Sequence, residues 1–299
     1  MGEQQSIQQQ FISEIADSIF EQSVNGKDTE EQCFFKLRFD PENEQLDNQN
    51  KNNNDIVSLM NQKLGCSPSA IQRLQKKVIE ALVNQYEQEM KADELDIESI
   101  LNAKRGEKDI WKRVYSWLWD KQFPRYLWET LRKKSDKNQD WIRFVDDSLV
   151  SSERGSILPK KPNPEPKIIP NNQSLNLVIN IDGDCCNHHL LLFNRSLTDF
   201  HLVCPSGEFS PNSKIEQIPW LMPTQGSIAE EVDMKFQFAT VGTEEFLAIV
   251  IEQPLELEWF NVREGEETAE CSPQRLVELW EQLEKNKNWR SFYQSFEVI

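Results

Sequence analysis

The stretch from Leu175 to Leu257 decides the fold, and it opens with LNLVINID (Leu175–Asp182). Apolar and polar side chains alternate along this octapeptide, which is typical of a strand with one buried face. Four more strand-like runs follow, bounded by turn residues: HLLLFN (His189–Asn194), FHLVCPS (Phe200–Ser206), MKFQFATVG (Met234–Gly242) and EFLAIVIEQP (Glu245–Pro254). The last run is the most apolar, so we expect it at the centre of the sheet. Short strands separated by turns predict an antiparallel β-sandwich or barrel.

This region resembles a known domain family. The matching segments are LLLFNR (Leu190–Arg195), LVCPS (Leu202–Ser206), Asn212–Pro219 and GTEEFLAIV (Gly242–Val250). Their order is similar to that in a bacterial domain family of unknown function, which is often appended to serine/threonine kinases and caspase-like peptidases. The resemblance implies a β-sandwich accessory domain without known catalytic residues.

Composition and charge restrict the class of protein. A chain of 299 residues has room for one large or two ordinary domains, and nine Trp and sixteen Phe can supply a packed core. The net charge of −17 argues against broad nucleic-acid binding by the whole molecule. No run of about twenty apolar residues is present, so we expect no membrane span. Six Cys without regular spacing, and no signal-peptide pattern, predict a reduced, cytoplasmic protein.

The segment Asp55–Val83 predicts two helices joined by a tight turn. Gly65 suits the end of the first helix, Ser67 can cap the second, and Pro68 suits its first position. The segment resembles the helix-turn-helix of sigma-factor region 4, which implies that the first turns of the second helix enter the major groove. The candidate DNA contacts are Ser69, Gln72, Arg73, Lys76 and Lys77. The alternative is a helical hairpin with a solvated basic face, because many acidic residues follow it.

Between Lys104 and Lys137, basic residues outnumber acidic ones and alternate with aromatic residues. Aromatic stripes at helical spacing are usually buried, so we expect a core with a basic rim rather than a stacking surface for single-stranded nucleic acid. This rim suits an acidic partner. Its candidate partner-binding residues are Lys112, Arg113, Arg132, Lys133 and Lys134.

A Pro-rich stretch, Ser151–Ser174, predicts a linker between a helical domain (1–150) and a β-sandwich domain (175–299). Its accessibility and the family resemblance suggest cleavage there by a caspase-like protease. Ser272 and Pro273 begin a predicted C-terminal helix. The residues after it are too apolar for a free tail and are expected to pack on the sheet or bind a partner. The partner-binding candidates among them are Trp289, Phe292 and Phe296.

Cys and His residues cluster between positions 185 and 204: Cys185, Cys186, His188, His189, His201 and Cys204. Paired C-x-x-C spacing is absent, and neighbouring residues of a strand point to opposite faces. Small sulfurs in apolar strands are usually inert core. We therefore expect no metal, no cofactor and no catalytic residue in this cluster.

The sequence thus predicts an α+β fold, with an N-terminal all-helical domain followed by a C-terminal antiparallel β-sandwich and a closing C-terminal helix. The function we expect is that of a non-enzymatic regulatory or adaptor protein in a bacterial signalling or defence pathway, whose partner is another protein such as a caspase-like protease or signalling kinase. The alternative is a sequence-specific DNA-binding regulator with a sensor β domain. A metal- or Cys-dependent hydrolase built on Cys185–Cys204 is a third interpretation.

Overall fold

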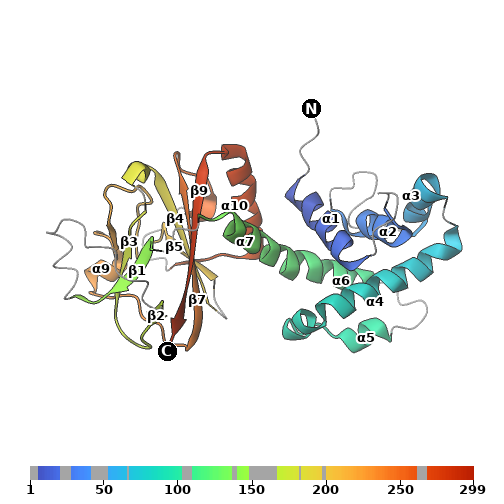
Figure 1. Cartoon of the computed structure of the whole chain (residues 1–299), viewed down its shortest axis with the longest axis horizontal. Coiled ribbons are helices and arrows are strands. Elements are labelled where there is room, and N and C mark those ends of the chain that lie inside the picture. The colour runs from blue at the N-terminus through green and yellow to red at the C-terminus, as the bar shows by residue number, and fades with distance from the viewer. Residues whose placement is uncertain are drawn as a thin grey trace. The chain divides into compact units, whose positions relative to one another are not determined.

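The chain is a mixed α+β protein, with helices in its N-terminal part and β-sheets in its C-terminal part (Figure 1). The computed structural model describes residues 6–20, 28–41, 53–65, 67–102, 110–136, 140–147, 167–181, 183–196, 200–260 and 268–299. The chain divides into two compact units, Met1–Tyr126 (unit 1) and Leu127–Ile299 (unit 2). The division falls inside helix α7 (Phe123–Lys134) rather than in the Pro-rich stretch. Residues 151–166 of that stretch, where we predicted cleavage, lie outside the described residues.

Unit 1 is helical in its described residues. Its elements before α7 are α1 (Ile7–Ile19), α2 (Glu30–Phe39), α3 (Asn53–Leu64), α4 (Pro68–Ala92), α5 (Ile97–Leu101), α6 (Ile110–Trp117) and the π-helical turn η1 (Leu118–Gln122). Helix α2 begins with a capping box, because Gln32 N donates to Thr29 Oγ1 (3.2 Å) and Thr29 N donates to Gln32 Oε1 (2.9 Å).

Aromatic side chains fill the core of unit 1, as we predicted for the stripe along α6. Trp111, Val114, Trp117 and Leu118 are all buried. Arg38 is also fully buried, and its guanidinium lies 4.4 Å from the centre of the Trp111 ring. Burial lowers the pKa of Arg38 to about 10, a value at which it still keeps its charge at neutral pH.

Within the described residues of unit 2, strands form two sheets. The six-stranded sheet has the order β2-β9-β7-β4-β5-β8, and the three-stranded sheet has the order β1-β3-β6. The larger sheet contains β2 (Ile168–Ile169), β4 (His189–Arg195), β5 (Phe200–Cys204), β7 (Gly242–Ile251), β8 (Ala269–Glu270) and β9 (Trp289–Val298). The smaller sheet contains β1 (Ile142–Val145), β3 (Asn176–Ile179) and β6 (Trp220–Met222). Short helical elements are η2 (Gly183–Cys185), α9 (Ile228–Glu231) and η3 (Glu258–Phe260), and α10 (Pro273–Asn286) is longer.

The chain ends in a strand, which corrects the predicted closing helix. Helix α10 forms where we expected it, but Lys287 takes a left-handed conformation (φ 53°) and the chain continues into β9. Strand β9 pairs along its whole length with β7, from Trp289 opposite Ile251 to Val298 opposite Gly242. The apolar residues after α10, which we expected either to pack on the sheet or to bind a partner, are therefore part of the sheet.

Strands β1, β2, β6 and β8 lie where no strand was predicted, and the first two change the domain boundaries. Strand β1 falls within residues 1–150, and its residues Ile142 and Phe144 point into the core of unit 2. Strand β2 falls within the Pro-rich stretch and pairs in parallel with β9. Because both join the sheets of unit 2, the helical domain is shorter than predicted and the end of the Pro-rich stretch is part of the fold.

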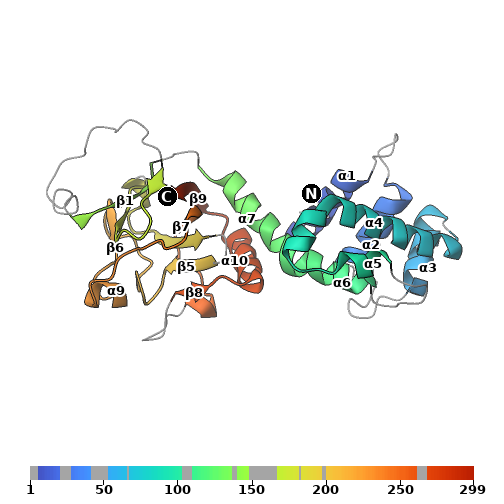
Figure 2. The same ribbon diagram turned by 90° about the horizontal axis from the view of Figure 1, so that it is seen from below.

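Both faces of the six-stranded sheet are covered. On one face, Phe246, Phe292 and Phe296 share a hydrophobic cluster with residues of the three-stranded sheet. Phe144 of β1 packs against four phenylalanine rings of this cluster. The opposite face meets residues 127–134 of α7 and the helix α10, which both views place beside the sheet (Figures 1 and 2). Burial on two faces explains why β7 is a continuous apolar run, and β7 is central in the sheet as we predicted.

No helix in the described part of the chain is long and apolar enough to cross a membrane.

Candidate functional site

Helices α3 and α4 occupy the segment predicted to contact DNA. Gly65, between them, has φ +70° and donates its N–H to Asn61 O (2.8 Å). Gln72, Arg73, Lys76 and Lys77 are exposed on α4, whereas the side chain of Ser69 lies outside the described residues.

Carboxylates already face the three cations on this surface. Lys77 lies 3.1 Å from Glu31 and Arg73 lies 3.9 Å from Glu30, both at the start of α2. Lys76 lies 3.6 Å from Glu80, one turn along α4. A phosphate approaching this surface would therefore meet acidic side chains as well as basic ones, which weakens its attraction.

The basic partner-binding candidates of unit 1 lie on α6. Lys112 is exposed. Arg113 donates to Ser99 Oγ (2.5 Å) and to Asp96 O (3.4 Å), so it ties α6 to the start of α5.

The basic candidates of unit 2 lie at the end of α7. Arg132 lies 3.9 Å from Glu245 and stacks over the ring of Tyr293. Lys134 lies over the rings of Trp280 and Trp289, 4.7 Å and 5.7 Å from their centres, whereas Lys133 is exposed. Arg132 and Lys134 thus already stabilise the packing of α7 on the sheet.

The aromatic candidates of β9 belong to the core. Phe292 is fully buried and Phe296 is 6% exposed, both in the cluster that contains residues of the two sheets. Trp289 is half-buried and donates its indole N–H to Leu283 O (3.1 Å). The side chains of Phe292 and Phe296 are therefore not available to a partner, which corrects their assignment as partner-binding residues.

The Cys and His residues do not converge on a site. Cys204 is completely buried and donates its thiol to main-chain oxygens of Leu190 (3.5 Å) and Asn212 (3.7 Å). Burial raises the pKa of the Cys204 thiol to about 12, so almost no thiolate forms at neutral pH. His189 Nδ1 lies 2.9 Å from Ser213 Oγ, and burial lowers the pKa of its ring. The described residues contain no group of three His, Cys, Asp or Glu that could hold a metal.

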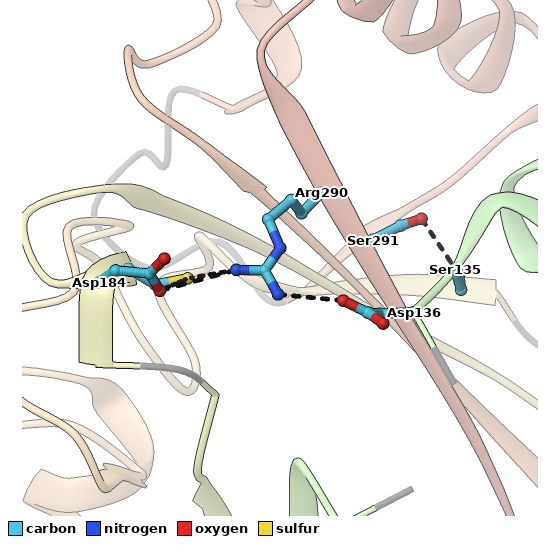
Figure 3. Close-up of polar contacts among 6 residues, drawn as sticks. Ser135, Asp136, Asp184, Arg290 and Ser291 are labelled. Atoms are coloured by element: carbon cyan, nitrogen blue, oxygen red, sulfur yellow. Dashed lines mark hydrogen bonds and ion pairs between the residues drawn. The ribbon is translucent and has the colours of Figure 1, made fainter. Parts of the chain in front are cut away.

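A polar cluster surrounds Arg290 at the start of β9 (Figure 3). Its guanidinium lies 3.0 Å from the Asp136 carboxylate, 3.6 Å from the Asp184 carboxylate and 3.9 Å from Cys185 Sγ. These three partners come from the segment after α7 and from η2, so Arg290 joins both to β9.

Two serines beside this cluster also make structural bonds. Ser135 Oγ lies 3.2 Å from Ser291 Oγ (Figure 3). Ser135 Oγ also donates to Leu131 O (2.9 Å), and Asp136 N donates to Ser291 O (2.7 Å). In the described part of the chain these two hydroxyls bond to Leu131 O and to each other, and not to a side chain that could act as the base of a serine nucleophile. We therefore interpret the cluster as an anchor for β9 rather than as a reaction site.

An open groove of about 1070 Å³ lies along β6 and the segment that precedes it. Val178 of β3 is part of its lining, and Leu221, which pairs with Val178 in register, lies beside it. The remaining lining residues are Ser210, Asn212, Lys214, Glu216, Gln217, Ile218, Pro219, Trp220, Pro223, Thr224 and Gln225. Strand β6 is an edge of the three-stranded sheet, so this groove follows a sheet edge.

Hydrogen bonds hold the walls of the groove. Ser206 and Ser210 exchange main-chain hydrogen bonds (2.8 and 3.1 Å). Thr224 N donates to Phe209 O (2.9 Å), and this bond joins the two ends of the segment 209–224. Lys214 N donates to Asn212 Oδ1 (2.9 Å) in a local Asx-type turn. The groove is therefore preformed rather than created by a ligand.

Comparisons of the chain with protein-family models, with curated proteins and with solved structures each gave no match. The function of the groove is therefore inferred from its own geometry and chemistry.

Sequence reasoning missed this groove. The segment Asn212–Pro219 was noted as part of a family resemblance but not as a binding surface, and Trp220 to Gln225 was not assigned a role. The available signal was a run of prolines, amides and apolar residues between two strands, a composition that is also common in ordinary loops.

Proposed function

We propose that the protein is a non-enzymatic regulatory or adaptor protein that binds another protein through the groove along β6. The main observation that supports this proposal is the groove itself, which is preformed, has a volume of about 1070 Å³ and lies beside a sheet edge. Its lining contains the apolar side chains of Ile218 and Leu221 and also exposed side-chain amides. Apolar side chains together with polar groups are the usual composition of a protein-binding surface.

The chemistry of the described groups supports binding over catalysis. The thiols of Cys204 and Cys271 are buried with pKa values raised to about 12, and Arg290 is held between two carboxylates. The groove lining contains one Lys and one Glu but no His or Cys. The hydroxyls of Ser210 and Thr224 in the lining donate to main-chain oxygens, of Asn212 (3.0 Å) and Phe209 (3.4 Å), so neither is paired with a base in these bonds.

For the identity of the partner and the architecture of unit 2, our proposal relies on the resemblance to the bacterial domain family. A caspase-like protease or a signalling kinase of a bacterial signalling or defence pathway is the proposed partner, in the cytoplasm, and unit 2 is proposed to be a β-sandwich. The hydrophobic cluster shared by the two sheets supports that architecture.

Affinity capture with the full chain tests this proposal. The groove variant carries Gln217→Lys and Gln225→Lys, two exposed positions of the lining. The matched control carries Gln253→Lys and Gln274→Lys, which are exposed in the same unit but outside the lining. We expect the wild type and the control to retain the same partner from native lysate and the groove variant to lose it. Retention of that partner by the groove variant would contradict the proposal.

A second candidate function is sequence-specific DNA binding through α4. Its support is the exposure of Gln72, Arg73, Lys76 and Lys77 on the helix that follows Gly65. Duplex binding should then fall steeply with salt and disappear in an Arg73→Ala variant. Absence of duplex binding at low salt would exclude this function.

A further inference from the structure

The groove is locally neutral in a strongly acidic protein. Lys214 and Glu216 are the charged residues of its lining, they carry opposite signs, and both are exposed. The whole chain carries a net charge of −17. The groove therefore offers no excess charge with which to select a phosphate, a basic helix or an acidic peptide.

Amides supply the polar chemistry of the groove. Asn212, Gln217 and Gln225 are exposed along its walls. Each primary amide has two N–H donors and a carbonyl acceptor, so it can pair with both the N–H and the C=O of a peptide backbone. Side chains of this kind recognise a main chain without requiring a particular charge.

Apolar side chains line the same groove. Ile218 and Leu221 are half-buried, Pro219 is exposed, and Pro223 is half-buried. Because these side chains are still partly exposed in the free protein, covering them removes further apolar surface from water. The hydrogen-bonded walls limit the ordering cost of that binding.

The dimensions suit an extended chain. The groove is open and follows an edge strand, and its volume lies just above the usual range of about 300–1,000 Å³ for small-molecule pockets. An extended segment advances about 3.3 Å per residue and can place alternate side chains in such a groove.

We infer that the groove binds an extended, uncharged peptide segment of the partner, with apolar side chains between Ile218 and Leu221 and main-chain groups on the amides of Gln217 and Gln225. This inference rests on the proposed function, because it names the part of the partner that occupies the same groove.

Selection from a displayed library of random linear peptides, with the full chain as bait, tests the inference. The strongest peptide is then synthesised with a fluorophore and titrated by anisotropy. We expect peptides without net charge, and an affinity that falls by about tenfold or more in the Gln217→Lys, Gln225→Lys variant, since truncating or altering central contacts typically has effects of this size. Leu221→Ala should weaken the peptide as well, and Gln253→Lys with Gln274→Lys should not.

The possible outcomes separate this inference from the proposed function. Selected peptides with a strong net charge, or peptides insensitive to the groove substitutions, would overturn the inference. If the library yields no peptide but the captured partner is still lost in the groove variant, the partner binds as a folded surface and only the inference fails. If groove-bound peptides are found but no partner is captured, only the proposed function fails.

Discussion

Asp93 at the end of helix α4 gathers three hydrogen-bond donors on one carboxylate. Arg125 Nη1 and Nη2 donate to Oδ2 (2.8 Å) and Oδ1 (2.6 Å), and Trp117 Nε1 donates to Oδ2 (2.8 Å). Partial burial raises the pKa of Asp93, but the hydrogen bonds from Arg125 and Trp117 outweigh it and leave the pKa below its ordinary 3.8. The ionised carboxylate thus stabilises unit 1 above the pKa of the unfolded state, and this stability is lost as the pH falls through the folded pKa.

Asp93→Asn should therefore lower the free energy of unfolding at neutral pH, by about 1–3 kcal/mol for a part-buried charged partner. The gap between wild type and variant should narrow as the pH falls below about 4, because the wild-type carboxylate then protonates too. Urea denaturation of both proteins across this pH range, followed by tryptophan fluorescence, measures the gap. If the difference in free energy of unfolding does not change with pH, the effect of the substitution comes from altered packing rather than from the lost charge.

The buried thiols should resist alkylation. The pKa values of Cys204 and Cys271 are raised to about 12 by burial, whereas Cys186 is only half-buried. Brief treatment of the native protein with iodoacetamide at mildly alkaline pH should therefore label Cys186 before Cys204 and Cys271, and peptide mass spectrometry can locate the label. Labelling in urea, where every thiol is accessible, is the control. Labelling of Cys204 as fast as Cys186 would revive the interpretation of a reactive cysteine.

At the scale of the element, strand β9 contributes buried aromatic side chains to the core of unit 2. Phe292 is fully buried at its centre, so Phe292→Ala should lower the free energy of unfolding by about 3–5 kcal/mol. Ile299→Ala removes an apolar side chain that is 65% exposed and should have almost no effect. Chemical denaturation of the two variants makes the comparison. Unchanged stability of Phe292→Ala would favour the earlier assignment of this residue to a partner.

The elements differ in how much of them the sequence reveals. The helices α4 and α10 have local start signals, Ser67 with Pro68 and Ser272 with Pro273, and both were predicted. Helix α2 also has a local start signal, a capping box in Thr29 and Gln32, which our predictions did not use. Strand β9 was missed as a strand because both faces of its sheet are covered, so its neighbouring Phe292 and Tyr293 hide the alternation.

The groove was harder to predict than any single element. Val178 and Leu221 lie far apart in the sequence and meet only because β3 pairs with β6. The same holds for the basic surface of α4. The sequence shows which of its residues are charged, but the pairing of Arg73 and Lys77 with Glu30 and Glu31 depends on how α2 packs beside α4. Local patterns therefore predict elements, whereas a site made by several elements needs their arrangement in space.

At the scale of the whole molecule, net charge and local charge make different predictions for binding. A net charge of −17 attracts any basic partner over a distance of about one Debye length, about 10 Å at 0.1 M salt, and added salt screens this attraction. A neutral segment held by amides and apolar side chains is nearly insensitive to this screening. The salt dependence of partner affinity thus reports which of the two surfaces, the acidic exterior or the neutral groove, makes the contact.

We expect the affinity of the captured partner to change less than about threefold between low and moderately high salt, since no excess charge lines the groove. Titration of the purified partner against the full chain over a series of salt concentrations provides the measurement, and the Gln253→Lys, Gln274→Lys control shows how far a change of net charge alone moves the curve. A steep loss of affinity with salt, shared by wild type and groove variant, would place the contact on the acidic exterior. A shallow salt dependence of the wild type, together with loss of binding in the groove variant, would place the contact in the groove. The groove is the surface that is both locally neutral and altered in that variant.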